Sequence, residues 1–336
     1  MSKNGWTRRL LPDSSQRVRR LVQFAFLLLN IWIGAQFYLF VRYIERGGWR
    51  VDRPPGAEGW LPIAGMMNTS LWLQTGNVPV IHPAAMVLFL AFLTISILFR
   101  KAFCGWLCPI GTISEQLWKL GRDTFRRVFF PPKWLDIPLR GLKYILLGLF
   151  VWFAGAMTAE SIQAFLSSPY GLVADVKMLD FFRHMSQTAA IVIGVLVVGS
   201  MLVPNMWCRY LCPYGALMGI AALASPLRIR RVPSACIDCA KCAKACPSNL
   251  PVDRLVQIRS AECLGCMECV AVCPAEGALY LGTKKRAVSP AFVAAAVAAV
   301  FLCAVGLARV TGHWHSPIPE HVYKVLIPEV ASLGHP

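Results

Sequence analysis

The sequence is poor in charged residues, and especially in acidic ones. Only 15% of its 336 residues are charged, whereas 56% are hydrophobic and the mean hydropathy is +0.53. Soluble proteins carry about 25% charged residues, so the composition excludes an ordinary soluble domain and predicts a polytopic membrane protein. The 34 basic residues outnumber 17 acidic ones, giving a formal net charge of +17. This excess would fit either nucleic-acid binding or an asymmetric membrane topology.

Two other signals are missing. Twelve of the 13 cysteines fall in cluster-type or Cys-x3-Cys-Pro motifs, so the spacing of a disulfide-stapled secreted domain is absent. No small-residue cleavage site follows the first apolar run, because the charged segment Arg42–Arg46 lies there instead. That absence argues against a cleaved signal peptide and favours a membrane anchor.

Five apolar runs approach the ~20 residues that a helix needs to cross a bilayer. We predict a mainly α protein, a polytopic helical core of about five spans with a small α+β module. A further helix is expected over 110–127, and an interfacial aromatic segment over 60–73. Gln23, Asn30 and Gln36 should face other helices, where polar side chains find partners. The spans are predicted at about 21–41, 78–99, 139–159, 189–203 and 288–309.

The basic residues are distributed unevenly between these spans. Segments on one side of the membrane carry 26 Lys and Arg residues, and those on the other side carry 8. Cytoplasmic loops are the richer in Lys and Arg, so topology explains the positive charge and no nucleic-acid partner is expected. We predict a bacterial inner-membrane protein with a membrane core at 21–207. The segments 1–20 and 208–287 would be cytoplasmic, and the tail 310–336 periplasmic.

The segment 208–287 holds two copies of one cysteine pattern, in motifs at about 227–255 and 256–284. Three cysteines two residues apart can bind three corners of a 4Fe-4S cluster, and in two-cluster ferredoxins the fourth cysteine of each run binds the other cluster. Zinc knuckles would instead use separated cysteine pairs. We therefore predict a bacterial-type two-cluster ferredoxin module with crossed ligand sets: Cys236, Cys239, Cys242 and Cys273 for the first cluster, and Cys263, Cys266, Cys269 and Cys246 for the second.

A second cysteine repeat lies at the ends of two predicted spans. Phe103–Gly111 and Trp207–Gly215 share an aromatic residue followed by Cys-x-aromatic-Leu-Cys-Pro-x-Gly. Proline suits the first turn of a new helix, so the second thiol of each pair should lie near a helix N-terminus. Three interpretations are open for these thiols: a third redox centre such as a third cluster, a thiol-disulfide relay, or a purely structural kink. The four cysteines are Cys104, Cys108, Cys208 and Cys212.

Together these motifs resemble the NapH/NosR-type membrane polyferredoxins, over about residues 20–285. The resemblance implies an electron donor, linked to quinol or to a cytoplasmic donor, that serves a respiratory reductase in the periplasm or the membrane. No catalytic residue can be named, so we expect an electron-transfer component rather than a stand-alone enzyme. The alternative function is a redox maturation, assembly or regulatory factor for a metalloenzyme.

Clusters at one membrane face cannot by themselves pass electrons through ~30 Å of hydrocarbon, so a quinone is a candidate cofactor. His82 and His184 lie on the predicted outer side and are candidate haem or quinol contacts, although interfacial histidines are commonly structural. Glu160 and Asp175 are candidate proton acceptors, but carboxylates in outer loops are usually solvated.

Overall fold

A computed structural model describes residue 9 and residues 13–334. The remaining residues of the predicted segment 1–20, and the last two of the predicted tail, lie outside this range. The chain divides into two compact units. The first unit comprises residues 1–27, 92–147 and 195–300, and the second comprises residues 28–91, 148–194 and 301–336.

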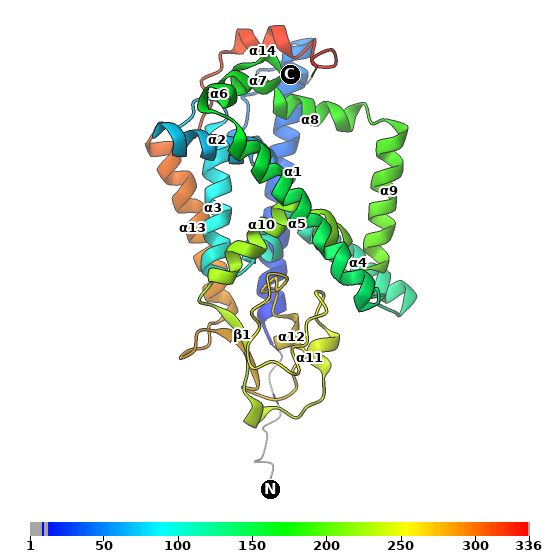
Figure 1. The fold of residues 1–336 in the computed structure, drawn as a ribbon. Helices are drawn as coiled ribbons and strands as arrows, with labels where there is room; N and C mark the ends of the chain where they lie inside the picture. Colours follow the sequence, from blue (N-terminus) through cyan, green and yellow to red (C-terminus); the bar gives the residue numbers. More distant parts are fainter. Residues whose placement is uncertain (1–8, 10–12, 335–336) are drawn as a thin grey trace. The chain divides into compact units, whose positions relative to one another are not determined.

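All five apolar runs are helical, as Figure 1 shows. Three of these helices are long and apolar enough to cross a membrane, and in the most apolar window of each only 17% of the residues are buried. Most of those side chains therefore face outward, as lipid contact requires. The three helices are α1 (Ser15–Arg46), α5 (Lys133–Ala156) and α13 (Pro290–Val310).

The other two apolar helices are shorter than the ~20 residues that a membrane span needs. Helix α3 (Pro83–Phe99) has 17 residues and α9 (Gln187–Leu202) has 16. Helix α9 follows α8 (Ala174–Arg183) after a bend of 84°. The described part of the chain thus contains three candidate spans, or four if the bent pair counts as one, and the five-span count remains a prediction.

Proline explains where two helices begin. The predicted second span starts at residue 78, but α3 begins at Pro83, a residue suited to a first helical turn. Helix α5 begins at Lys133, directly after Pro131 and Pro132, six residues before the predicted start. Sequence hydropathy located both helices, and local backbone chemistry set their ends.

In the first unit, each repeated cysteine turn leads into a helix. The π-helical turn Phe103–Leu107 precedes α4 (Pro109–Phe125), which covers the expected helix at 110–127. The π-helical turn Trp207–Leu211 precedes α10 (Pro213–Ala221), followed by the 3-10 turn Ala222–Ala224. The sequence repeat is therefore also a structural repeat.

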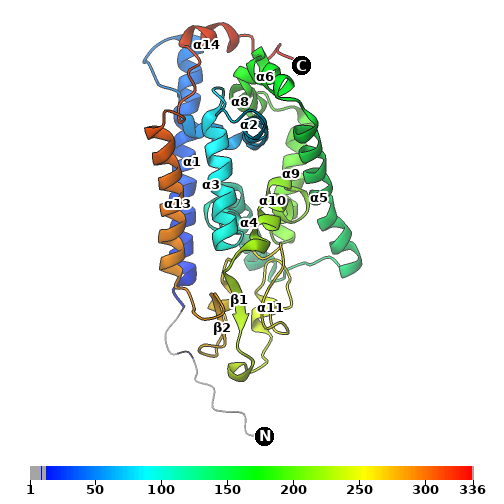
Figure 2. The same cartoon turned by 60° about the vertical axis from the view of Figure 1, so that its left-hand side comes forward.

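The ferredoxin segment of the first unit is a small α+β structure. Strand β1 (Arg228–Arg231) lies beside strand β2 (Leu279–Gly282), as Figure 2 shows. The two strands pair antiparallel, with Arg228 opposite Gly282. The 3-10 turn Pro233–Ala235 and two four-residue helices lie between the strands in sequence. These helices are α11 (Lys241–Lys244) and α12 (Glu268–Ala271).

The second unit is built from short helices and the ends of long ones. Its core includes Phe37, Phe40, Tyr323 and Ile327, and the rings of Phe40 and Tyr323 meet edge to face with centroids 5.4 Å apart. The expected interfacial segment at 60–73 is largely α2. The remaining elements are the 3-10 turn Pro55–Trp60 and the helices α2 (Pro62–Thr75), α6 (Ala159–Ser167), α7 (Pro169–Leu172), α8 and α14 (Glu320–Leu326).

Candidate functional site: three sets of cysteines

The two ferredoxin runs share one backbone conformation. Asp238 and Ala240 in the first run have φ of 53° and 54°, and Gly265 and Met267 in the second have φ of 63° and 57°. These residues occupy matching places between the cysteines. Left-handed φ is unfavourable for residues other than glycine, so three of the four positions hold a strained conformation that curls the loop. Each loop then enters its short helix.

The second run meets the last cysteine of the first run. One pocket of the first unit is lined by four cysteines together with apolar side chains that include Ile229, Leu250, Val252 and Ile258. Four thiols around an apolar pocket are a donor set that fits a 4Fe-4S cluster. The four cysteines are Cys246, Cys263, Cys266 and Cys269.

The reciprocal arrangement holds for the last cysteine of the second run. Burial raises the pKa of Cys273, and the nearby Cys239 and Cys236 raise it further. Burial likewise raises the pKa of Cys242, with Cys273 contributing. Cys273 therefore lies near the three cysteines of the other run, and its assignment as their fourth ligand stays a prediction.

The buried thiols favour a bound metal over a free thiolate. Burial raises the pKa of Cys246 to about 11, so without metal this thiol keeps its proton at neutral pH. Iron binds the thiolate and displaces that proton. Cluster binding at these thiols would therefore be coupled to the release of their protons.

The repeated membrane-end cysteines also converge. Burial raises the pKa of Cys104 to about 12 and that of Cys108 to about 11, and in both cases the nearby Cys212 contributes. The pKa of Cys208 is raised by burial and then by the three other cysteines. Four thiols from two distant segments thus lie in one neighbourhood, beside the ring of Tyr214.

Two of these four thiols cap helices. Cys108 is the N-cap of α4, and its Sγ accepts a hydrogen bond from the Gly111 amide at 3.5 Å. Cys212 caps α10 in the same way, with its Sγ 3.2 Å from the Gly215 amide nitrogen. The predicted position near a helix N-terminus is therefore confirmed, and such amides stabilise a negatively charged sulfur.

Both cysteine turns bind the loops of the second ferredoxin set. Trp106 donates its indole N–H to the Gly265 carbonyl at 3.3 Å, and Arg209 donates to the Pro247 carbonyl at 2.9 Å. Gly105 is required at its position, because a Cβ there would lie 2.7 Å from the Leu264 carbonyl oxygen. The ferredoxin segment is therefore docked directly on the repeated turns.

Two protein families match the cysteine-containing segments of the chain. A 4Fe-4S dicluster domain matches residues 228–286, and a 4Fe-4S binding domain matches residues 81–127 and 186–231. The first match contains all eight ferredoxin cysteines, and the second contains the four repeated ones.

Individual proteins similar to this chain point to the same kind of protein as the family matches do. YccM of Escherichia coli (strain K12), a candidate electron transport protein by its name, is 48% identical over 94% of this chain and 91% of its own length. The chain belongs to the membrane ferredoxin-type proteins. NapH of Haemophilus influenzae, named a ferredoxin-type protein, is 25% identical over 56% of this chain and 61% of its own. The regulatory protein NosR of Pseudomonas aeruginosa is 30% identical over 44% of this chain but only 20% of its own. No solved structure matches.

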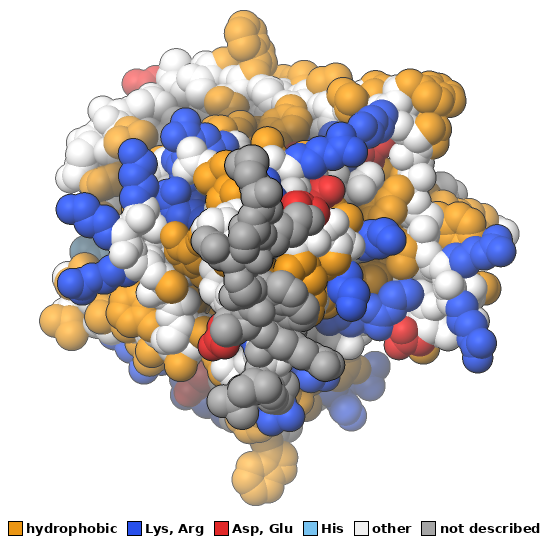
Figure 3. Space-filling view, turned by 90° about the horizontal axis from the view of Figure 1, so that it is seen from below, with side chains coloured by type: hydrophobic (Ala, Val, Ile, Leu, Met, Phe, Trp, Pro, Cys, Tyr) orange, Lys and Arg blue, Asp and Glu red, His pale blue; other side chains and the backbone are white. Residues whose placement is uncertain are grey.

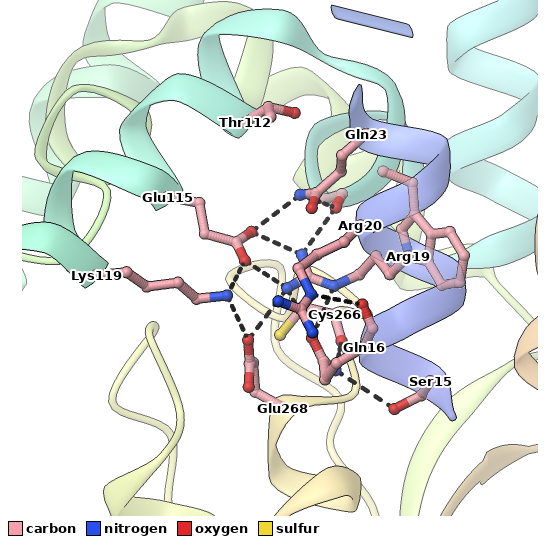
Figure 4. Close-up of polar contacts among 12 residues, drawn as sticks. Ser15, Gln16, Arg19, Arg20, Gln23, Thr112, Glu115, Lys119, Cys266 and Glu268 are labelled. Atoms are coloured by element: carbon pink, nitrogen blue, oxygen red, sulfur yellow. Dashed lines mark hydrogen bonds and ion pairs between the residues drawn. The ribbon is translucent and has the colours of Figure 1, made fainter. Parts of the chain in front are cut away.

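Sequence reasoning missed a buried ionic network beside the second run of this ferredoxin-type protein (Figure 4). Arg19 of α1 makes a two-bond pair with Glu115 of α4, at 2.5 and 2.7 Å. Glu115 would be harder to ionise through burial alone, but Arg19 and Lys119 lower its pKa to about 2. Arg19 belongs to the basic residues that the sequence assigned to topology, and Gln23, which donates to Glu115 at 3.0 Å, confirms the expectation that it faces another helix. The sequence signal that could have found the network was Arg19 itself, a basic residue one helical turn before Gln23 at the start of the first apolar run.

In the second unit, His82 is buried in a charged cluster. Its Nδ1 lies 3.3 Å from Glu58 Oε1, and its Nε2 lies 2.8 Å from the Gly171 carbonyl oxygen. Burial acts to raise the pKa of Glu58, but Arg53 and then His82 lower it below its usual range. Since both ring nitrogens have partners, this arrangement leaves neither free for a haem iron.

The other candidate residues of the second unit differ in exposure. His184, the C-cap of α8, is exposed, and its Nδ1 lies 2.7 Å from Oδ1 of Asp180, one turn earlier. Glu160 is exposed, as expected for an outer-loop carboxylate. Asp175 is buried and pairs with Arg53 at 2.6 Å, so the expectation that it is solvated is wrong. The cause is an arginine 122 residues away in sequence.

A cavity of about 600 Å³ lies beside this charged cluster in the second unit. Its walls are mainly apolar and aromatic, with a few polar groups, which is the usual character of a pocket for an organic ligand. The lining includes Trp60, Met67, His82, Phe165, Tyr170 and Lys177.

Proposed function

We propose that this chain is a membrane-bound electron-transfer protein whose ferredoxin segment carries two 4Fe-4S clusters. The observation that carries the proposal is the pocket lined by Cys246 of the first run and all three closely spaced cysteines of the second. The clusters supply one-electron transfer, and the chain supplies thiolates, a dry surrounding and amides near sulfur, which set the potentials. No residue is assigned a catalytic role of its own.

We further propose that the four repeated cysteines hold a third cluster. Three features support this: the thiols converge, two of them accept amide hydrogen bonds, and the matched family is described as a 4Fe-4S binding domain. Buried Lys101 acts electrostatically on Cys104 and Cys208, where a cation would offset the negative charge of a cluster. The docked second run would be its neighbour.

The basic residues support a cytoplasmic position for the ferredoxin segment. Figure 3 shows Lys and Arg side chains spread over the face seen from below. The first unit exposes the run Lys284, Lys285 and Arg286, as well as Arg126 and Arg127. Positive residues are retained on the cytoplasmic side of a bacterial inner membrane, so we place this segment and the N-terminus there, with the tail in the periplasm.

The cavity of the second unit supports a link to quinol. A quinol headgroup is a flat ring with two polar oxygens, and the cavity offers aromatic walls that include Trp60, Phe165 and Tyr170. A carrier of this kind would serve a redox enzyme in the membrane or periplasm. NapH and NosR resemble the chain over about half its length, and a respiratory reductase is the partner that we propose by analogy.

Iron content tests the proposal. Anaerobically purified protein should contain about twelve irons and twelve acid-labile sulfides per chain, four of each per cluster. Cys212→Ser should reduce the iron to about eight, while the control Cys303→Ser, at an exposed cysteine of α13, should leave it unchanged. About eight irons in the unaltered protein would exclude the third cluster and leave the thiol relay, and four or fewer, with zinc present, would exclude the proposed function.

A further inference from the structure

The network around Arg19 joins two of the cysteine segments within the first unit. We propose that Arg19 positions the second ferredoxin run against the turn Phe103–Leu107, and that its charge raises the reduction potential of the cluster bound by that run. The inference rests on the proposed function, since it assumes a cluster at the second run. Among the described residues, the hydrogen bonds of Arg19 go to Gln16, Gly105, Glu115 and Glu268 and not to a cysteine, so Arg19 is a positioning residue.

The first contact of Arg19 is with the repeated cysteine turn. Its Nη1 donates to the Gly105 carbonyl at 3.1 Å, and Gln23 donates to the same oxygen at 3.1 Å. The same Nη1 donates to Glu115, on the helix that Cys108 caps. One guanidinium therefore holds both the middle of the turn and the helix that follows it.

The second contact is with the ferredoxin run. Nη2 of Arg19 donates to Glu268 Oε1 at 3.2 Å, and Glu268 lies between Cys266 and Cys269 in sequence. Gln16, one turn earlier on α1, donates to the Cys266 carbonyl at 2.8 Å. The Cys266 sulfur lies among these side chains in Figure 4. Helix α1 thus holds the loop that carries two of the proposed ligands.

Only an arginine can make this set of contacts. Its planar fork bonds a carboxylate with two parallel hydrogen bonds and still donates to further acceptors, whereas lysine is a point charge on a flexible stem. Arg19 is fully buried, and Glu115 and Glu268 balance its charge. Lys119, at 2.6 and 3.0 Å from the same two carboxylates, completes the network.

The sign of the effect follows from charge. Reduction adds one electron to the cluster and so makes it more negative, and a nearby cation stabilises that state. Of the network's charges, Arg19 and Glu268 act on Cys266, and Arg19 acts more strongly. Arg19 bonds Glu268, which lies between two proposed ligands, whereas Glu115 lies on α4 and bonds Arg19, Gln23 and Lys119. Removing Arg19 and Glu115 together should therefore still leave the second cluster harder to reduce.

Three variants separate position from charge. Arg19→Gln/Glu115→Gln removes both members of the buried pair and leaves no unpaired charge between them. Arg19→Lys keeps the charge and loses the fork. Arg17→Gln, which removes an exposed arginine of the same helix, is the control for losing an arginine of α1 outside the network. Iron is counted first in each variant, so that loss of clusters is distinguished from a change in their properties.

There are two readouts. The first is the reduction potential of each cluster, from a redox titration monitored by EPR, and the second is hydrogen exchange of backbone amides. The double variant should reduce the equilibrium constant for reducing the second cluster about tenfold, or about 59 mV for one electron. The first cluster and Arg17→Gln should show no shift. Amides of residues 103–108 and 263–269 should exchange faster in Arg19→Lys, with the potential retained.

Two results would overturn the proposal. An unshifted second potential in the double variant with full iron would remove the charge effect, and unchanged exchange in Arg19→Lys would remove the positioning role. Iron missing from the unaltered protein would instead refute the proposed function, and exchange would then still decide the positioning role.

Discussion

The two units contain different kinds of candidate functional residues: nearly all cysteines lie in the first unit, and the large cavity lies in the second. Twelve of the thirteen cysteines lie in the first unit, and the second holds only Cys303. The second unit contains the cavity of about 600 Å³ and the buried charges of Arg53, Glu58 and Asp175. The proposed metal ligands and the cavity therefore belong to different units, and substitutions in one unit should leave ligand binding in the other intact.

The largest effect should come from the crossed cysteines. Cys246→Ser and Cys273→Ser should each remove about four irons, because each deletes one ligand of one cluster. Cys239 is exposed, whereas Cys246, Cys263 and Cys269 are buried, so a chelator should take iron from the first cluster faster. Cys273→Ser should then retain the slowly chelated iron, and Cys246→Ser the rapidly chelated iron.

Loss of the same kinetic phase in both cysteine variants would contradict the crossed assignment. Ligand binding in the cavity of the second unit is the control, and it should be equal in both variants. A parallel loss of that binding would show that the units are not chemically separate.

The second prediction concerns an ion pair in the first unit. Arg209 and Asp136 are buried and 2.9 Å apart, and Arg209 also holds the Pro247 carbonyl. Arg209→Gln leaves Asp136 with Arg140 and Tyr210 as its remaining partners and should destabilise the protein by up to about 3 kcal/mol. Asp238→Asn is the matched contrast, since Asp238 is exposed in its pair with Arg231 and should contribute about 0–1 kcal/mol.

Thermal unfolding followed by cluster absorbance measures both substitutions. Equal shifts would mean that the buried pair is no more important than the exposed one. A shift confined to Arg209→Gln would show that the docking of the ferredoxin segment stabilises the first unit.

The sequence predicted the features that depend on local spacing. The crossed cysteine sets follow from two runs of matched spacing, because a short loop can present only three ligands and needs a fourth from elsewhere. The two Cys-x3-Cys-Pro turns were predicted in the same way, since proline marks the start of α4 and α10. These relations involve residues close together in the chain.

Pairings between distant segments could not be read from spacing. Arg19 and Glu115 are 96 residues apart, and no periodic pattern links a basic residue of α1 to a carboxylate on α4. Asp175 looked like a solvated loop residue because its partner Arg53 lies far away in sequence. Hydropathy placed the helices α3 and α9, but it reports apolar composition and not helix length, so their role as spans stays a prediction.

The third prediction tests the cavity of the second unit. Ala174→Phe would place a large ring in the cavity lining, and quinol-dependent reduction of the clusters should fall at least about tenfold, equivalent to about 1.4 kcal/mol. Ala164→Phe, at an exposed position of the neighbouring helix α6, is the control and should reduce normally. Dithionite should reduce both variants fully, with unchanged iron. Normal quinol oxidation by Ala174→Phe would remove the cavity from the proposed function.

The smallest effect should appear as a pH dependence of the first unit. The pKa of Glu115 is lowered to about 2 in the folded protein, from about 4.5 in an unfolded chain. A lowered carboxyl pKa stabilises the fold above pH 4.5, and that stability is lost as pH falls towards the folded pKa. Between pH 7 and pH 4 the loss should be about 1 kcal/mol.

The variant Glu115→Gln should lack this pH-dependent stability, whereas Glu160→Gln, at an exposed position in the second unit, should retain it. Thermal midpoints at pH 7, 5 and 4 measure the difference, and identical pH profiles for the two variants would show that Glu115 is not the group whose ionisation stabilises the first unit.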